Sequence, residues 1–91
     1  IIPNALKVFD AYPNPFNPTT SIRIQSESIL TNITLSIFNI NGQLIQTLEK
    51  EATNAHSMDI KWDGSRNSSG VYFIKIDWPS GSRTQKITLL N

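Results

Sequence analysis

Three prolines within six residues constrain the fold of this chain more than any other feature. They lie in the segment Tyr12-Pro13-Asn14-Pro15-Phe16-Asn17-Pro18, which leads directly into Thr19. Each proline ring fixes its own φ, removes a backbone donor and disfavours helical geometry for the residue before it. We therefore predict a stiff, extended, polyproline-like corner that lies outside any helix or central strand. Tyr12 and Phe16 are available to pin it onto a core, and its strand-like flanks suggest a crossing between two sheets.

The length and charge of the chain exclude several classes of protein. At 91 residues it is predicted to be one domain, too small for a deep catalytic cleft. Its net charge of +1 comes from scattered residues, so no nucleic-acid or anionic-membrane partner is expected. The lack of cysteine excludes disulfides, and no apolar run is long enough for a transmembrane segment. The start at Ile1-Ile2-Pro3 is typical of a piece of a longer polypeptide, so residues 1–7 are expected to end a linker and 8–91 to form the domain.

Apolar residues alternate with polar ones along most of the chain, which predicts about seven short strands. The predicted strands cover 6–12, 21–25, 33–38, 43–48, 56–62, 71–78 and 83–90. Asn41-Gly42 predicts a hairpin between the third and fourth strands, because both residues tolerate positive φ. Residues 42–52 also fit a helix, since Leu44, Ile45 and Leu48 have helical spacing, and residues 49–55 read as a polar loop. The strand at 71–78 is apolar on both faces over its first half and is placed centrally.

This pattern of short strands and frequent turns predicts an all-β fold, an antiparallel immunoglobulin-like β-sandwich of about seven strands. The cysteines that flank the tryptophan of true immunoglobulin domains are absent.

The chemistry-bearing residues give no catalytic or metal site. His56 is the only histidine and shares a strand face with Met58, Ile60 and Trp62, which predicts a partly buried strand residue. The carboxylates are dispersed, and Asp63-Gly64 lacks the spacing of a calcium loop. We expect no enzyme activity and no cofactor.

Aromatic residues leave one alternative open. Tyr72 and Trp78 share a strand face with Ile74 and Ile76, which favours a place in the core. If Tyr72 and Trp78 were instead exposed, they could stack on sugar rings. The chain would then be a non-catalytic carbohydrate-binding or adhesive module of a secreted enzyme.

Five motifs in order resemble the C-terminal sorting domain (type A) of cargo proteins of the type IX secretion system. They are Tyr12 to Ile22, Ile33 to Ile45, Trp62-Asp63-Gly64, Ser69 to Phe73 and Lys86 to Leu90. The motif residues expected to build the fold are Pro13, Asn14, Pro15, Phe16, Pro18, Gly42, Trp62, Asp63 and Gly64. A similar motif order occurs in the immunoglobulin-like domain of flagellar hook-capping proteins. The strand at Lys86 to Leu90, directly before the end of the chain, favours the sorting domain.

The resemblance implies that this domain directs a larger cargo protein, N-terminal to it in the same precursor, across the outer membrane. The cargo would pass through the periplasm and reach the cell surface or the medium. The implied partners are the outer-membrane translocon and a sortase-like peptidase that removes the domain before surface attachment. Cleavage would fall upstream of the proline corner, and no cleavage residue is assigned.

The resemblance also implies, from the position of the matching motifs, that the translocon recognises the last two strands. The candidate residues are Gly70, Val71, Tyr72, Lys86, Ile87, Leu89 and Leu90. A terminal strand offers unpaired backbone groups for strand addition to a partner. We therefore hypothesise that the edge from Arg83 to Leu90 is recognised, with Lys86 facing outward and Ile87 and Leu89 inward.

Overall fold

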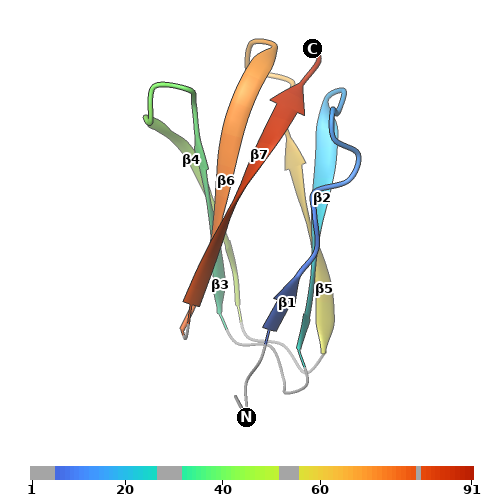
Figure 1. Cartoon of the computed structure of the whole chain (residues 1–91), viewed down its shortest axis with the longest axis vertical. Coiled ribbons are helices and arrows are strands. Elements are labelled where there is room, and N and C mark those ends of the chain that lie inside the picture. The colour runs from blue at the N-terminus through green and yellow to red at the C-terminus, as the bar shows by residue number, and fades with distance from the viewer. Residues whose placement is uncertain (1–5, 27–31, 52–55, 80) are drawn as a thin grey trace.

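The computed structural model describes residues 6–26, 32–51, 56–79 and 81–91, and they form two antiparallel sheets packed face to face (Figure 1). The strands are β1 (Leu6–Val8), β2 (Thr19–Ser26), β3 (Ile33–Phe38), β4 (Leu44–Lys50), β5 (Ser57–Asp63), β6 (Gly70–Trp78) and β7 (Gly81–Leu89). One sheet has the order β1-β2-β5 and the other β4-β3-β6-β7. The predicted seven-stranded antiparallel sandwich is confirmed, with β6 in a central position.

The fourth strand settles two local alternatives. Residues 44–50 are strand, so the helical alternative for 42–52 is wrong over that range, and residues 52–55 lie outside the described part of the chain. The predicted loop at Glu49 is also wrong, because Glu49 and Lys50 pair with Thr34 and Ile33 of β3. Pairing with a neighbouring strand overrides the polar character of these two residues.

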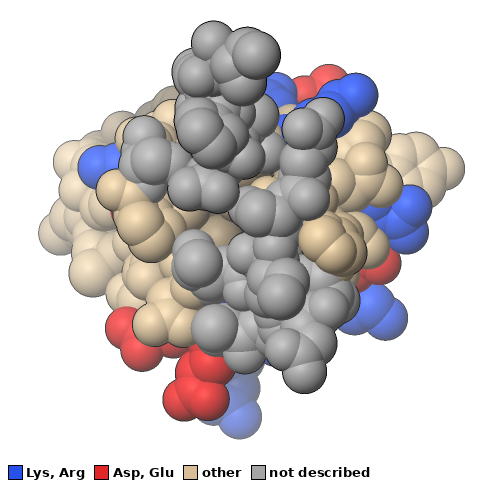
Figure 2. Space-filling view, turned by 90° about the horizontal axis from the view of Figure 1, so that it is seen from below, with Lys and Arg blue, Asp and Glu red and all other residues tan. Residues whose placement is uncertain are grey.

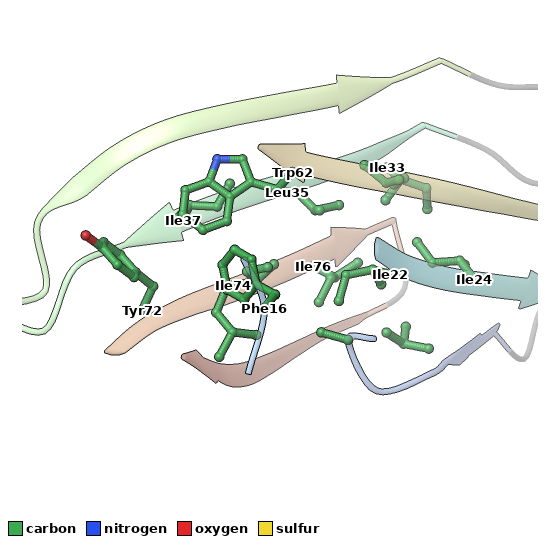
Figure 3. Packing of buried hydrophobic residues seen from close by; sticks show 14 of the residues in the cluster. Phe16, Ile22, Ile24, Ile33, Leu35, Ile37, Trp62, Tyr72, Ile74 and Ile76 are labelled. Carbon is green, nitrogen blue, oxygen red and sulfur yellow. The ribbon is translucent and has the colours of Figure 1, made fainter. Parts of the chain in front are cut away.

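The core lies between the sheets and is made by the inward side chains of nearly every strand (Figure 3). Trp62 of β5 lies near its centre and is 1% exposed. Its ring contacts Phe16 and Tyr72, each with centroids 5.6 Å away and in a tilted or edge-on geometry that aromatic pairs favour. The indole N–H donates to Gln46 Oε1 at 2.9 Å, so the polar atom of this buried ring is paired.

The predicted hairpin between β3 and β4 is present, but its turn is longer than a two-residue Asn-Gly turn. The Asn39 N–H donates to the Gln43 carbonyl at 3.0 Å, which encloses Ile40, Asn41 and Gly42. Gly42 has φ +80°, whereas Asn41 does not have positive φ. A three-residue hairpin loop needs a left-handed residue only at its last position, and glycine meets this need.

The proline corner differs from its predicted path. It joins β1 to β2, which are neighbours in the same sheet, so it does not cross between sheets. Tyr12 pairs with Ser21 of β2, and Phe16 then forms a parallel bridge to Leu89 of β7 in the opposite sheet. The segment therefore bends between the two sheets and does not run as a straight polyproline spacer.

The two aromatic residues of the corner have opposite roles. Phe16 is 1% exposed and packs in the core, as predicted. Tyr12 is 80% exposed, so the prediction that it pins the corner is wrong. Its backbone is held by paired hydrogen bonds with Ser21, both 3.0 Å, and its ring is left on the surface.

Candidate recognition surface

The outward side chains of β6 and β7 make a continuous face on the four-stranded sheet. The register places Phe38 of β3 opposite Phe73 of β6, and Phe73 opposite Lys86 of β7. We call these three residues the outer row. Phe38 and Phe73 are half-buried and Lys86 is exposed. A row of two aromatic side chains ending in a cation, on a face turned to solvent, is a surface that a protein partner can contact.

Of the predicted recognition residues, the structure leaves four accessible. Lys86 is exposed, Gly70 and Val71 are half-buried, and Leu90 is 51% exposed. Tyr72, Ile87 and Leu89 are buried in the core at 8%, 0% and 0% exposure. No partner can touch these three side chains while the sandwich is folded, so they serve the fold that presents the others.

Phe73 and Phe38 were not among the predicted site residues. The sequence signal for Phe73 was available, because Val71 and Phe73 make the second apolar face of β6. Nothing in the sequence pairs Phe38 with Phe73, which are 35 positions apart. Their alignment follows from the β3–β6 register.

The predicted free edge of β7 is largely closed between Lys86 and Leu90. The Asn14 side chain donates to the Lys86 carbonyl at 3.0 Å and accepts from the Thr88 N–H at 3.0 Å. The Phe16 N–H donates to the Thr88 carbonyl at 2.9 Å, and the Leu90 N–H donates to the Phe16 carbonyl at 2.8 Å. Strand addition at this part of the edge, as we hypothesised, would have to displace the proline corner.

A second set of contacts ties β7 to the chain that follows β1. The Gln85 side chain is 8% exposed; it donates to the Phe9 carbonyl and accepts from the Ala11 N–H, both at 2.8 Å. The Arg83 guanidinium donates to the Val8 carbonyl and forms an ion pair with Asp10 at 2.6 Å. These contacts close the sandwich on the β1–β7 side.

The Trp62-Asp63-Gly64 motif links β5 to the proline corner. The Gly64 N–H donates to the Pro18 carbonyl at 2.8 Å, and Gly64 is buried beside Leu89, so a larger residue here would require the Leu89 side chain to shift. A Cβ at position 64 would lie 3.1 Å from Leu89 Cδ2. Asp63 accepts from the Ser65 N–H at 2.9 Å, and this hydrogen bond lowers the pKa of the Asp63 carboxyl.

The residues considered for chemistry are not brought together. His56 is exposed and precedes β5, so the prediction that it is partly buried is wrong; the inward face of this strand begins with the half-buried Met58. Within the described ranges, no three metal-ligating side chains form a group, and no helix is long and apolar enough to cross a membrane.

The predicted sugar-stacking pair is likewise not available as a platform. Tyr72 is buried, and its hydroxyl donates to the Ser68 carbonyl at 2.7 Å. Trp78 is half-buried and packs against the core, with Gly81 close to its ring. Pairing of β6 with β3 and β7 turns both side chains inward.

Charged side chains of both signs are interspersed on the surface. Seen from the end of the sandwich where β1 begins, basic and acidic groups lie near one another on the right and at the lower left of the described rim (Figure 2). The described residues at this rim thus include both signs of charge, which agrees with a net charge of +1.

Comparison with known proteins identifies the family. Residues 10–89 match the family model described as a secretion system C-terminal sorting domain. Among solved structures, the chain is similar to dimeric latent PorU from Porphyromonas gingivalis, with a TM-score of 0.71 and 22% sequence identity. That match covers 99% of this chain and 10% of the PorU chain, so this chain spans a small part of that protein. No curated protein matches the sequence.

The family model covers most of the chain, and this chain therefore belongs to the family of secretion system C-terminal sorting domains. Domains of this family are sorting signals for type IX secretion, which exports its cargo to the cell surface or the extracellular space. Sorting domains are in general non-catalytic. The likeness to PorU supports the β-sandwich fold.

Proposed function

We propose that the type IX translocon recognises this domain through the outer face of β6 and β7, centred on the outer row of Phe38, Phe73 and Lys86. The observation that carries the proposal is the alignment of these side chains in consecutive positions across three strands. Val71 and Thr88, opposite each other in the next outward row, extend the same face.

This face suits recognition better than the edge of β7 does. Its side chains are accessible without any change in the sandwich, whereas the edge from Lys86 to Leu90 is occupied by Asn14 and Phe16. Half-buried aromatic residues lose little conformational entropy on binding and provide a large contact area. Lys86 would add an attraction to an acidic group of the partner.

In this proposal the domain is the C-terminal part of a larger precursor, of which residues 1–7 end the linker and 8–91 form the signal. The precursor passes through the periplasm, and the translocon then exports it across the outer membrane. A sortase-like peptidase removes the domain upstream of the proline corner, and the cargo remains on the cell surface or is released. Gly70 and Leu90, at the ends of the last two strands, would lie at the margin of the recognised face.

The test fuses the chain to the C-terminus of a periplasmic reporter in a bacterium that has a type IX system. Phe73→Ser and Lys86→Ala should each reduce the reporter at the cell surface about ten-fold, the effect of losing a contact worth about 1–2 kcal/mol. Lys50→Ala, which removes an exposed lysine from β4 of the same sheet, is the matched control and should leave export unchanged.

Thermal unfolding of each purified variant separates recognition from folding. Lys86→Ala, at an exposed position, should alter the free energy of unfolding by about 1 kcal/mol or less. Phe73→Ser, at a half-buried position, should cost about 1–2 kcal/mol and leave the domain folded. Normal export of a folded Phe73→Ser, Lys86→Ala double variant would refute the proposed surface. Truncation after Gln85 is a poorer test, because it removes the buried Ile87 and Leu89 together with the surface.

A further inference from the structure

The outer face of the three-stranded sheet carries a second surface, on the opposite side of the sandwich from the outer row. Two cross-strand rows build it. In one, the Phe9 N–H donates to the Arg23 carbonyl at 2.9 Å, and Arg23 is the register partner of Asp59. In the other, Tyr12 pairs with Ser21, which is the partner of Lys61. Each row therefore runs across the sheet from the β1 side to β5.

The small side chain of Ser21 leaves a hollow between its larger neighbours. Phe9 and Tyr12 form its aromatic side, and Arg23, Asp59 and Lys61 form its polar side, with Asp10 at the margin. The hollow has a volume of about 450 Å³. This volume is within the range of small-molecule sites, about 300–1,000 Å³.

The polar side of the hollow is fixed in place. Arg23 donates to Asp59 through Nε at 3.0 Å and through Nη2 at 3.3 Å, which holds both planar groups in one orientation. Both side chains remain about half exposed, at 57% and 47%. The remaining guanidinium N–H groups and carboxylate lone pairs can therefore still bind a ligand. This hydrogen bond also lowers the pKa of the Asp59 carboxyl.

On the aromatic side, the Tyr12 ring does not pack in the core. Tyr12 is 80% exposed, although its backbone is anchored by two hydrogen bonds to Ser21. Phe9 lies beside it in the hollow, and the ammonium group of Lys7 lies 4.7 Å from the centre of the Phe9 ring. The Tyr12 ring is thus positioned at the hollow and free to contact a ligand.

The position of the hollow on the three-stranded sheet determines which protein groups could contact a ligand. β2 lies between β1 and β5, so its backbone groups are hydrogen-bonded on both sides along the paired residues. An extended peptide cannot add as a strand at this face, since strand addition needs an unpaired edge. Recognition would come from side chains alone. These are the Tyr12 ring, the Ser21 hydroxyl, the donors and acceptors of the Arg23–Asp59 pair, and the Lys61 ammonium group.

We propose that this hollow binds a pyranose ring of a saccharide. One face of the sugar would stack on Tyr12, and its vicinal hydroxyl groups, which are both donors and acceptors, would bind the Arg23–Asp59 pair and Ser21. Lys61 donates to a further sugar oxygen from the opposite side. The inference is independent of the translocon surface, which lies on the other sheet, and it places a glycan site away from Tyr72 and Trp78.

The test is an NMR titration of the ¹⁵N-labelled 91-residue chain with the methyl glycosides of glucose, galactose, mannose and xylose. With at least one of them, the amide signals of Tyr12, Ser21, Arg23 and Lys61 should shift and saturate at millimolar concentrations. Tyr12→Ala should weaken binding at least about ten-fold, which corresponds to about 1.4 kcal/mol. Tyr12→Phe keeps the ring, so its dissociation constant should lie within about two-fold of that of the original chain.

Ile40→Ala is the control for loss of an exposed apolar side chain elsewhere, since Ile40 is 70% exposed in the β3–β4 hairpin. It should bind as the original chain does. The proposal is overturned if none of the four glycosides shifts these amides, if the shifts fall on other residues, or if Tyr12→Ala binds as tightly as Tyr12→Phe. Tyr12→Ala should fold normally because the ring makes no core contact, and its amide spectrum verifies this in the same experiment.

Discussion

At the scale of single residues, alternate positions of the proline corner have different roles. In the corner, Tyr12 is exposed, Asn14 bonds to the backbone of β7, and Phe16 is buried against Trp62. The prolines restrict the backbone so that these three side chains are presented in different directions. Thr20 adds a hydrogen bond from its hydroxyl to the Pro13 carbonyl at 2.8 Å.

Replacement of Phe16 tests this division of roles. Phe16→Ala should lower the free energy of unfolding by about 3–5 kcal/mol, because it removes a buried ring and leaves a cavity beside Trp62. Tyr12→Ala is the matched control and should change it by about 0.5 kcal/mol or less, as for an exposed site. Urea titration followed by tryptophan fluorescence measures both. Equal losses in the two variants would contradict the assignment of Phe16 as the pin.

At the scale of elements, the last strand is less open than an edge strand usually is. Unpaired strand edges promote association with other chains, and proteins commonly cover them. Here the Asn14 side chain and the Phe16 backbone cover the edge of β7 from Lys86 onward and bond to Leu90 just after it. Gln85 and Arg83 hold the earlier part of the strand against the chain that follows β1. The outward face of the same strand remains accessible through Lys86.

Amide hydrogen exchange can test whether Asn14 closes this edge. In Asn14→Ala, the Thr88 N–H loses its acceptor and should exchange several-fold faster, as expected for a hydrogen bond worth about 1 kcal/mol. The Leu90 N–H, which donates to the Phe16 carbonyl, is the internal control and should change much less. Unchanged exchange at Thr88 would show that the Asn14 contact does not protect the edge.

At the scale of the whole molecule, the fold separates two surfaces on opposite faces of one core. The four-stranded sheet presents the outer row, and the three-stranded sheet presents the hollow beside Tyr12. Trp62, Phe16 and Tyr72 connect the sheets between them (Figure 3). A domain of this size can hold both surfaces because, in β2, β3 and β5, buried side chains alternate with side chains that face solvent.

The stability of the whole molecule should fall in acid. Asp59 and Asp63 have pKa values below the ordinary one, the first because of its hydrogen bond from Arg23 and the second because of its hydrogen bond from Ser65. A lowered carboxyl pKa stabilises the folded state above the unfolded value of about 3.9, and this contribution is lost as the pH falls through the folded value. The melting temperature should therefore decrease below about pH 5.

Arg23→Gln should flatten this acid dependence, since it removes the main cause of the lowered Asp59 pKa. Lys50→Gln changes the net charge equally but lies on the other sheet, and it should leave the slope unchanged. Melting temperatures measured from pH 7 down to about pH 3 provide the comparison. Identical slopes in the two variants would show that the Arg23–Asp59 pair contributes nothing to the acid response.

Much of this structure was determined by the sequence alone. Alternation in β2, β3, β5 and β7 identified the inward residues, because a strand turns successive side chains to opposite faces whatever its neighbours are. Glycine at position 42 indicated the hairpin, and the ordered motifs indicated the family.

What alternation cannot supply is the pairing of strands distant in sequence. Only the tertiary structure decided that Phe38, Phe73 and Lys86 form one row, that β4 continues through Glu49, and that His56 is exposed. It also decided that the proline corner covers the edge of β7, which depends on contacts between residues more than seventy positions apart, and that Tyr12 is left in solvent.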